Sequence, residues 1–214
     1  CIPTKALLHS AEIFEEAKNG ASAGVIASPQ LDFSKVMENK EAVVSRLVGG
    51  VNSLLKANGV KVIEGEASFV DKTTLSVKTK DGEQEVKADK YIIAAGSVPA
   101  VVPIEGINSP QCIDSTGALS LDKVPESMAV IGGGVIGVEM ATAYSTFGTK
   151  VTIIEMLPRL LMNIDEDAVK IIAESLEEKG VEIMTSTKVV SIADNGAKAS
   201  VKVEKDGKEL FVEA

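Results

Sequence analysis

The sequence has 214 residues, 45% of them apolar, so it is long enough to bury one large hydrophobic core or two smaller ones. Its formal charge of −9 and its lack of tryptophan disfavour nucleic-acid binding, and no apolar run reaches the roughly 18 residues that a membrane-spanning helix needs. Two cysteines are too few for a disulfide scaffold or a zinc cluster. We therefore expect a soluble, cytoplasmic protein of one or two domains that binds no nucleic acid, membrane or metal.

Two amphipathic helices are predicted at the start of the chain. Residues 4–18 and 34–57 both carry apolar side chains at helical spacing, and Gly59 is placed to end the second helix. The apolar positions are Leu7, Leu8, Ala11, Phe14 and Ala17 in the first helix and Val44, Leu47, Val48, Val51, Leu54 and Leu55 in the second. Such faces are expected to pack against a core.

Short β-branched runs follow the helices. They lie at 61–63, 67–70, 74–79 and 85–87, with Asp81-Gly82 as a hairpin turn, and they predict an antiparallel meander. Residues 90–95, Lys-Tyr-Ile-Ile-Ala-Ala, are typical of a buried strand that ends at Gly96.

The second half repeats much of the first. Residues 55–63, with Leu-x-x-x-Gly-Val, match residues 176–184, and the Lys-Asp-Gly turn at 80–82 matches the one at 205–207. The segment at 88–96 has no counterpart before the chain stops at Ala214, and the glycine loop of the second half has none in the first. We therefore expect a chain truncated at both ends.

A glycine loop links a predicted strand at 127–131 to a helix that Gly148 closes. The loop satisfies G-x-G-x-x-G, in which glycines allow a tight turn, close approach of backbone amides to a pyrophosphate, and close packing of helix on sheet. The predicted dinucleotide-binding residues are Gly132, Gly133, Gly134, Val135, Ile136 and Gly137.

The next predicted strand, 151–154, ends in Glu155. It follows Gly132 at roughly the 20-residue spacing of the acid that accepts hydrogen bonds from ribose hydroxyls, and its charge would repel the 2′-phosphate of NADP. NAD is therefore the expected dinucleotide. Arg159 lies nearby, but Pro158 before it indicates a turn.

Cys1-Ile2-Pro3-Thr4-Lys5-Ala6-Leu7-Leu8 resembles the second half of the redox-active disulfide motif of flavin-dependent pyridine nucleotide-disulfide oxidoreductases, most closely the dihydrolipoamide dehydrogenase branch. Residues 92–99, 115–121 and 131–139 resemble further segments of that family in the same order. The resemblance implies an α/β fold with tandem Rossmann-like FAD- and NAD(P)-binding domains, each combining a parallel sheet with a β-meander. Residues 1–120 would be the rear part of the FAD domain and 121–214 the NAD domain without its last strand.

The resemblance also implies catalytic roles for Cys1, Lys5 and Glu139. A thiol at a helix N-terminus close to an ammonium has its thiolate favoured. In the family this cysteine faces the flavin, and its disulfide partner stands five residues earlier. Lys5 would lie beside the flavin and form a buried pair with Glu139.

Cofactor contacts carried over from the family fall on both halves. FAD contacts are expected at Lys5, Ala67, Ala95, Gly96 and Ser97, and NAD contacts at the glycine loop, Glu139, Glu155 and Val189. Ala95 departs from the family, which usually has threonine there, so a hydroxyl hydrogen bond is lost.

The function implied is FAD-dependent oxidation of protein-bound dihydrolipoamide with NAD, in a homodimer that serves 2-oxoacid dehydrogenase or glycine-cleavage complexes. A mercuric reductase-like enzyme is the first alternative, and glutathione reductase, which prefers NADP, fits Glu155 less well. As it stands, the chain could instead be a non-catalytic NAD-binding module. His9 and Cys112 are assigned packing or surface roles.

Overall fold

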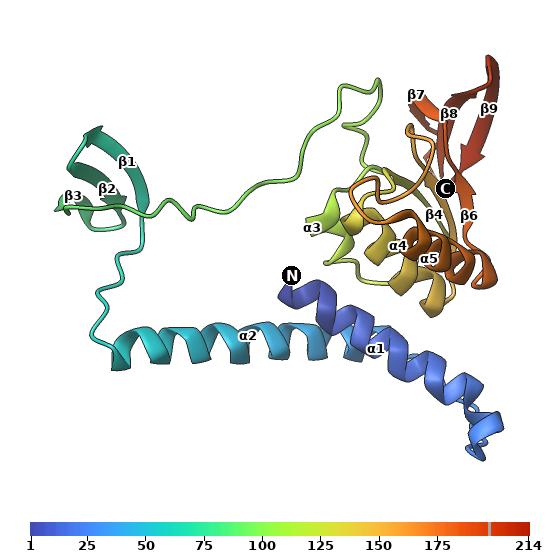
Figure 1. The fold of residues 1–214 in the computed structure, drawn as a ribbon, viewed down its shortest axis with the longest axis horizontal. Coiled ribbons are helices and arrows are strands. Elements are labelled where there is room, and N and C mark those ends of the chain that lie inside the picture. Colours follow the sequence, from blue (N-terminus) through green and yellow to red (C-terminus); the bar gives the residue numbers. More distant parts are fainter. Residues whose placement is uncertain (197) are drawn as a thin grey trace. The chain divides into compact units, whose positions relative to one another are not determined.

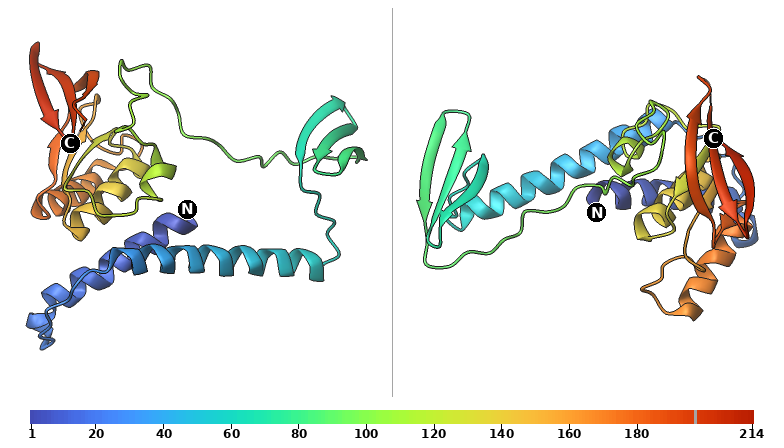
Figure 2. Two further views of the ribbon diagram at one scale, coloured as in Figure 1. Left: turned by 180° about the vertical axis from the view of Figure 1, so that it is seen from behind. Right: turned by 90° about the horizontal axis from the view of Figure 1, so that it is seen from above.

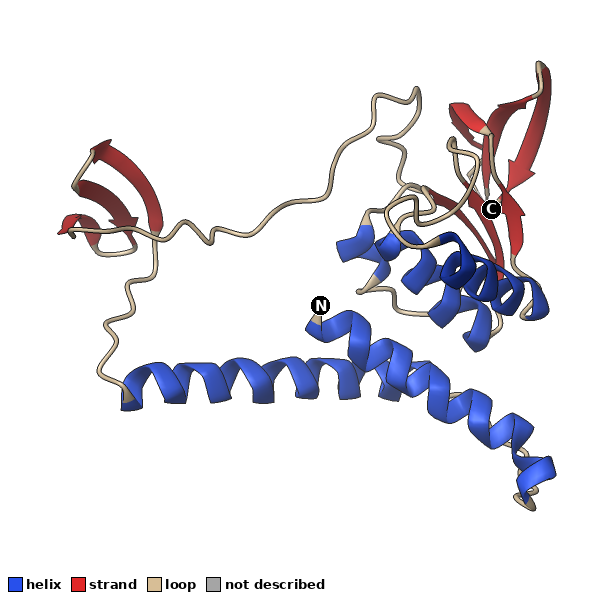
Figure 3. Cartoon of the chain, viewed as in Figure 1, coloured by secondary structure: helices blue, strands red, loops and turns tan. Residues whose placement is uncertain are grey.

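The chain folds into two compact units (Figures 1 and 3). The structure, a computed structural model, describes residues 1–196 and 198–214. The first unit comprises Cys1–Val44 and Pro99–Ala214, and the second comprises Ser45–Val98. Among the described residues, none of the helices combines the length and apolarity needed to cross a bilayer. The division into cofactor domains at residue 120 stays a prediction.

A three-stranded parallel sheet forms the centre of the first unit. Strands β4 (Ser127–Ile131), β5 (Lys150–Ile154) and β6 (Glu182–Met184) pair in register, with β5 in the middle. Helix α4 (Val135–Phe147) connects β4 to β5, and α5 (Glu166–Glu178) connects β5 to β6. Parallel neighbours require such helical crossovers, so the predicted α/β class with a parallel sheet is confirmed.

The parallel sheet has a hydrophobic core on each face, because successive strand residues point to opposite sides. Val151 and Ile153 belong to the core shared with α1, α4 and α5, whereas Ile154 packs with the antiparallel meander. That meander consists of β7 (Lys188–Asp194), β8 (Ala199–Lys205) and β9 (Lys208–Glu213), and its course can be followed in Figure 2. The first unit therefore has three layers: helices, parallel sheet and meander.

Helix α1 (Ile2–Asn19) and the start of α2 (Phe33–Ala57) complete the helical layer. The 3-10 turn Gly20–Ala23 follows α1, and a short helix α3 (Ser115–Ala118) precedes β4. Leu7 of α1 is fully buried in the core with α4. The Phe33 ring lies 6.3 Å from that of Tyr144 and 5.8 Å from that of Phe147. The first helix predicted from sequence is thus confirmed, and it is anchored to α4.

The buried phenol of Tyr144 predicts a loss of stability at alkaline pH. Its hydroxyl donates to Ala118 O, and burial raises its pKa from 10.0 to about 12. Since the folded state favours the neutral phenol, this stability is fully present below pH 10 and is lost as pH rises through about 12. Two pKa units correspond to about 2–3 kcal/mol.

We expect the free energy of unfolding, measured in urea, to fall by about that much more between pH 10 and 12 in the native chain than in Tyr144→Phe. The other ionisable groups are the same in both proteins, so their contributions cancel in the comparison. An identical alkaline dependence of the two proteins would contradict the prediction.

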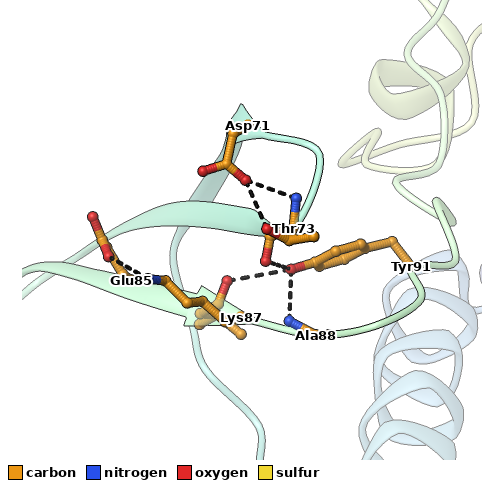
Figure 4. A network of polar contacts seen from close by, with 7 residues as sticks. Asp71, Thr73, Glu85, Lys87, Ala88 and Tyr91 are labelled. Carbon is orange, nitrogen blue, oxygen red and sulfur yellow. Dashed lines mark hydrogen bonds and ion pairs between the residues drawn. The ribbon is translucent and has the colours of Figure 1, made fainter.

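The second unit is built on an antiparallel meander of β1 (Glu66–Asp71), β2 (Thr74–Thr79) and β3 (Gly82–Lys87). Tyr91 closes it: its hydroxyl donates to Thr73 O at 2.7 Å and accepts from the Ala88 N–H at 2.9 Å (Figure 4). In the turn between β1 and β2, the Asp71 carboxylate accepts from the Thr73 N–H and hydroxyl, which lowers the pKa of Asp71. The predicted meander is confirmed.

The internal repeat is visible where α2 and α5 end. The Val60 N–H donates to Leu55 O and the Val181 N–H to Leu176 O, both at 3.0 Å. Gly59 and Gly180 have φ of 70° and 79°, the left-handed conformation that glycine permits at a helix end. The repeated Leu-x-x-x-Gly-Val sequence therefore forms the same turn at the end of both helices.

Two strand predictions are wrong. Residues 182–184 form β6 beside β5, but the matching residues 61–63 form no strand, and 90–95 are irregular with Ile92 94% exposed. A strand requires a neighbouring strand to which its backbone can hydrogen-bond. Among residues 1–196 and 198–214, no strand pairs with residues 61–63 or with residues 90–95.

The expected burial of the second helix is also only partly met. Leu47, Val48, Val51 and Leu54 of α2 are 45–65% exposed, although the helix itself forms as predicted. Only the beginning of α2 packs into the core, where Phe33 is buried and Lys40 donates to Leu119 O. Periodicity therefore predicted the helix but not which turns of it would be covered.

Candidate functional site

The glycine loop leaves the N-terminus of α4 open. Gly132 has φ of 109°, a conformation that non-glycine residues rarely adopt, and its N–H donates to Ile154 O at 2.9 Å. A Cβ on Gly137 would lie 2.1 Å from Gly132 O, so only glycine allows α4 to start this close to the turn. Around Gly134, the N-cap residue, no atom of the described residues other than Gly134 and its chain neighbours lies within 4 Å of a Cβ position. Backbone amides at this end can therefore be approached by an anion.

Glu155 faces the glycine loop from the end of β5. One carboxylate oxygen accepts from the Gly133 N–H at 2.6 Å and the other from the Leu157 N–H at 2.7 Å. A carboxylate has about four acceptor positions, so Glu155 can also accept bonds from two ribose hydroxyls. The open helix end and the fixed acid together fit the ADP portion of NAD.

The helix that begins at Cys1 reaches the same part of the first unit. Cys1 is the exposed N-cap residue of α1, and its carbonyl accepts from the Lys5 N–H at 3.0 Å. The Lys5 ammonium donates to the Glu139 carboxylate on α4, two residues beyond Gly137. The structure thus brings α1, the thiol helix with Cys1 at its N-cap, next to α4, the helix that follows the glycine loop. The catalytic roles of Cys1, Lys5 and Glu139 stay predictions.

The burial expected of the Lys5–Glu139 pair is not found. The Lys5 side chain is 61% exposed and that of Glu139 is 22% exposed. An ion pair this accessible contributes only about 0–1 kcal/mol to stability. The expected contribution of this ion pair is therefore to orient the Lys5 side chain and to set the local charge, and not to stabilise the fold.

The other predicted cofactor residues belong to both units. Ala67 lies on β1 and Ala95, Gly96 and Ser97 lie in the irregular stretch after β3, all in the second unit, so their FAD contacts stay predictions. Val189 is buried on β7 in the core that contains Ile154, and its contact with NAD likewise stays a prediction.

The two remaining polar candidates, His9 and Cys112, lie in ordinary surface or packing environments. His9 is exposed, with Nδ1 3.4 Å from a Glu12 carboxylate oxygen. Burial, and secondarily the charge of Asp194, raises the pKa of the Cys112 thiol, so that thiol is less reactive than an ordinary one. No cluster of His, Cys, Asp and Glu suited to a metal ion occurs among the described residues.

Sequence reasoning missed the loop after Glu155. Leu160 and Leu161 are buried at 2% and 6% exposure, and the Leu161 N–H donates to Gly133 O at 2.9 Å. The sequence signal there was Pro158, which indicates a turn but gives no direction to the side chains that follow.

The whole chain, residues 1–214, matches the family model described as pyridine nucleotide-disulphide oxidoreductase. The chain belongs to the pyridine nucleotide-disulphide oxidoreductase family. Dihydrolipoyl dehydrogenases of Geobacillus stearothermophilus and Staphylococcus aureus are 40% and 43% identical to it over all of its length.

Two solved structures share the fold. A Cu(II) complex of the HOCl-induced flavoprotein disulfide reductase RclA from Escherichia coli superimposes with a TM-score of 0.80 at 32% identity, covering 99% of this chain and 44% of that one. LpdA from Mycobacterium tuberculosis gives a TM-score of 0.83 at 24% identity, covering 99% of this chain and 47% of that one, which supports the fold alone. The chain spans 46% of the length of both dihydrolipoyl dehydrogenases.

Proposed function

We propose that the chain supplies the thiol helix and the NAD-binding domain of a FAD-dependent dihydrolipoamide dehydrogenase. The observation that carries this proposal is the ion pair between Lys5 on α1 and Glu139 on α4. It places an exposed cysteine helix beside the helix that the glycine loop opens, within one compact unit. A protein that only bound a dinucleotide would need no thiol there.

Each residue has a defined part in this proposal. The glycine-loop amides bind the pyrophosphate of NAD, and Glu155 accepts from the adenosine ribose. Lys5 favours the thiolate of Cys1 by its charge and is itself oriented by Glu139. When bound, FAD and NAD supply the hydride-transfer chemistry. Ala67 and residues 95–97 are proposed to contact FAD.

The proposed reaction balances as a two-electron oxidation. Dihydrolipoamide loses two electrons and two protons as its dithiol becomes a disulfide, and NAD⁺ takes up a hydride while one proton is released. The 40–43% identity to dihydrolipoyl dehydrogenases favours this substrate. We further propose that the intact enzyme is a homodimer. It would oxidise the lipoyl-bearing subunits of 2-oxoacid dehydrogenase or glycine-cleavage complexes.

A disulfide reductase with a different substrate is the second candidate, favoured by the 32% identity to RclA. The two candidates are distinguished by the reaction rates of a flavin-loaded holoenzyme that contains these residues. We expect it to reduce NAD with dihydrolipoamide much faster than it reduces Hg(II) or small disulfides with NADH. The reverse preference would support the second candidate.

Calorimetry with NAD and NADP tests the dinucleotide site on the chain itself. We expect NAD to bind about tenfold more tightly than NADP, because the 2′-phosphate would lie beside the Glu155 carboxylate. Glu155→Gln keeps an acceptor for the Gly133 N–H but removes the charge, so it should narrow the difference between the two dinucleotides. The purified chain should show no flavin absorbance. Tighter binding of NADP by the native chain would overturn the site assignment.

A further inference from the structure

Arg159 holds the loop after Glu155 against the glycine loop. We propose that Arg159 is a positioning residue for dinucleotide binding, acting through Leu160 and Leu161 on Gly133, and that it is not a phosphate ligand. This inference rests on the proposed NAD site and adds to it a residue that contacts no dinucleotide.

The guanidinium of Arg159 closes the loop by binding its backbone. Nη2 donates to Met162 O at 3.1 Å and Nη1 donates to Ile164 O at 2.9 Å. The Ile164 N–H in turn donates to Leu161 O at 2.8 Å. Arginine suits this task because its planar group carries several donors in a fixed geometry and stays charged. The loop thereby has a fixed shape without regular secondary structure.

The closed loop holds Leu161 in an unfavourable backbone conformation. Leu161 has φ of 47°, in the left-handed region that branched side chains avoid. Such conformations persist where surrounding contacts impose them, and they concentrate at functional sites. In this conformation the Leu161 N–H donates to Gly133 O at 2.9 Å, while its side chain stays buried.

Gly133 is consequently held on three sides. Its carbonyl accepts from Leu161, its N–H donates to Glu155, and Leu160 Cδ2 lies 2.4 Å from the position that a Cβ on Gly133 would take. Leu160 therefore packs directly on the glycine backbone. The orientation of the loop amides and that of the ribose-binding acid are set by the same contacts, which depend on Arg159.

The hydrogen bonds of Arg159 argue against a role in binding the NADP 2′-phosphate. Three of its five N–H groups already donate to carbonyls of its own loop, at Leu161, Met162 and Ile164, which leaves two for a phosphate. A movement of the guanidinium toward a phosphate would weaken these bonds and loosen the loop beside Gly133. Recognition of phosphate by this side chain would thus compete with its support of the glycine loop.

The test compares Arg159→Met with Arg46→Met in the full chain. Methionine keeps an apolar stem but donates to no carbonyl, and Arg46, on the exposed surface of α2, supplies a matched loss of charge. By calorimetry with NAD, well below the unfolding temperature, we expect binding about tenfold weaker in Arg159→Met and unchanged in Arg46→Met. Amide hydrogen exchange at Leu161 and Gly133 should accelerate in Arg159→Met alone. Arg159→Lys should restore only part of the affinity.

Four results would overturn the inference. NAD affinity within twofold of the native value in folded Arg159→Met would do so, as would a selective loss of NADP binding. If Arg159→Met does not fold, Arg159→Lys takes its place. Native NAD affinity together with native exchange rates in Arg159→Lys would also refute the positioning role. If the native chain binds no NAD, the proposed function fails, and unchanged exchange at Leu161 in Arg159→Met would separately refute the positioning role.

Discussion

Gly137→Ala is expected to destabilise the first unit by about 3 kcal/mol or more and to abolish detectable NAD binding. The added methyl group would lie 2.1 Å from Gly132 O and 3.1 Å from Val130 Cγ1. Neither neighbour can move easily, because one is backbone of the glycine turn and the other belongs to β4. Helix α4 would have to shift away from the sheet, and the loop amides would shift with it.

Gly134→Ala is the matched control. Its φ is −75°, and apart from residue 134 and its chain neighbours no atom of the described residues lies within 4 Å of the new methyl group. Urea unfolding followed by circular dichroism should show a loss below about 1 kcal/mol, the value of an altered N-cap. NAD binding should still weaken, since the methyl group projects where the pyrophosphate is proposed to lie. Equal stability of the two variants would contradict the predicted close packing at Gly137.

Leu7→Ala is expected to lower the free energy of unfolding of the first unit by about 2–5 kcal/mol. Leu7 is fully buried, in the core that also includes Met140 and Tyr144 of α4. Its removal leaves a cavity where α1 meets α4, and loosening of α1 also releases Lys5 from Glu139.

Ile13→Ala serves as the control on the same helix. Ile13 is 54% exposed, so its truncation should change the free energy of unfolding by no more than about 0.5 kcal/mol. Both variants are compared by urea unfolding at pH 7. A loss of similar size in both would mean that α1 is not anchored through Leu7.

Features encoded by neighbouring residues could be predicted from the sequence. The strand, glycine turn and helix from Ser127 to Phe147 agree with the structure because two of the glycines are required by local geometry, Gly132 by a positive φ and Gly137 by close packing. Cys1 and Lys5 are brought together by one turn of α1. The contact between Lys5 and Glu139 joins distant segments, and only the family resemblance implied it.

Features that depend on a distant neighbour could not be read in the same way. Residues 61–63 and 182–184 carry matching patterns, but only the second set lies beside a strand, β5, and becomes β6. The apolar stripe of α2 predicts a helix without stating what covers it. Arg159 was missed as a functional residue because it binds backbone carbonyls, which leave no signature in side-chain spacing.

The packing of α1 on α4 has a consequence for how such proteins can vary. One hydrophobic interface carries the cysteine helix on one side and the glycine-loop helix on the other. A substitution there displaces Cys1 and the glycine loop relative to each other, even when neither of them is altered. Evolutionary change at this interface is therefore expected to occur as compensated pairs, one member on each helix.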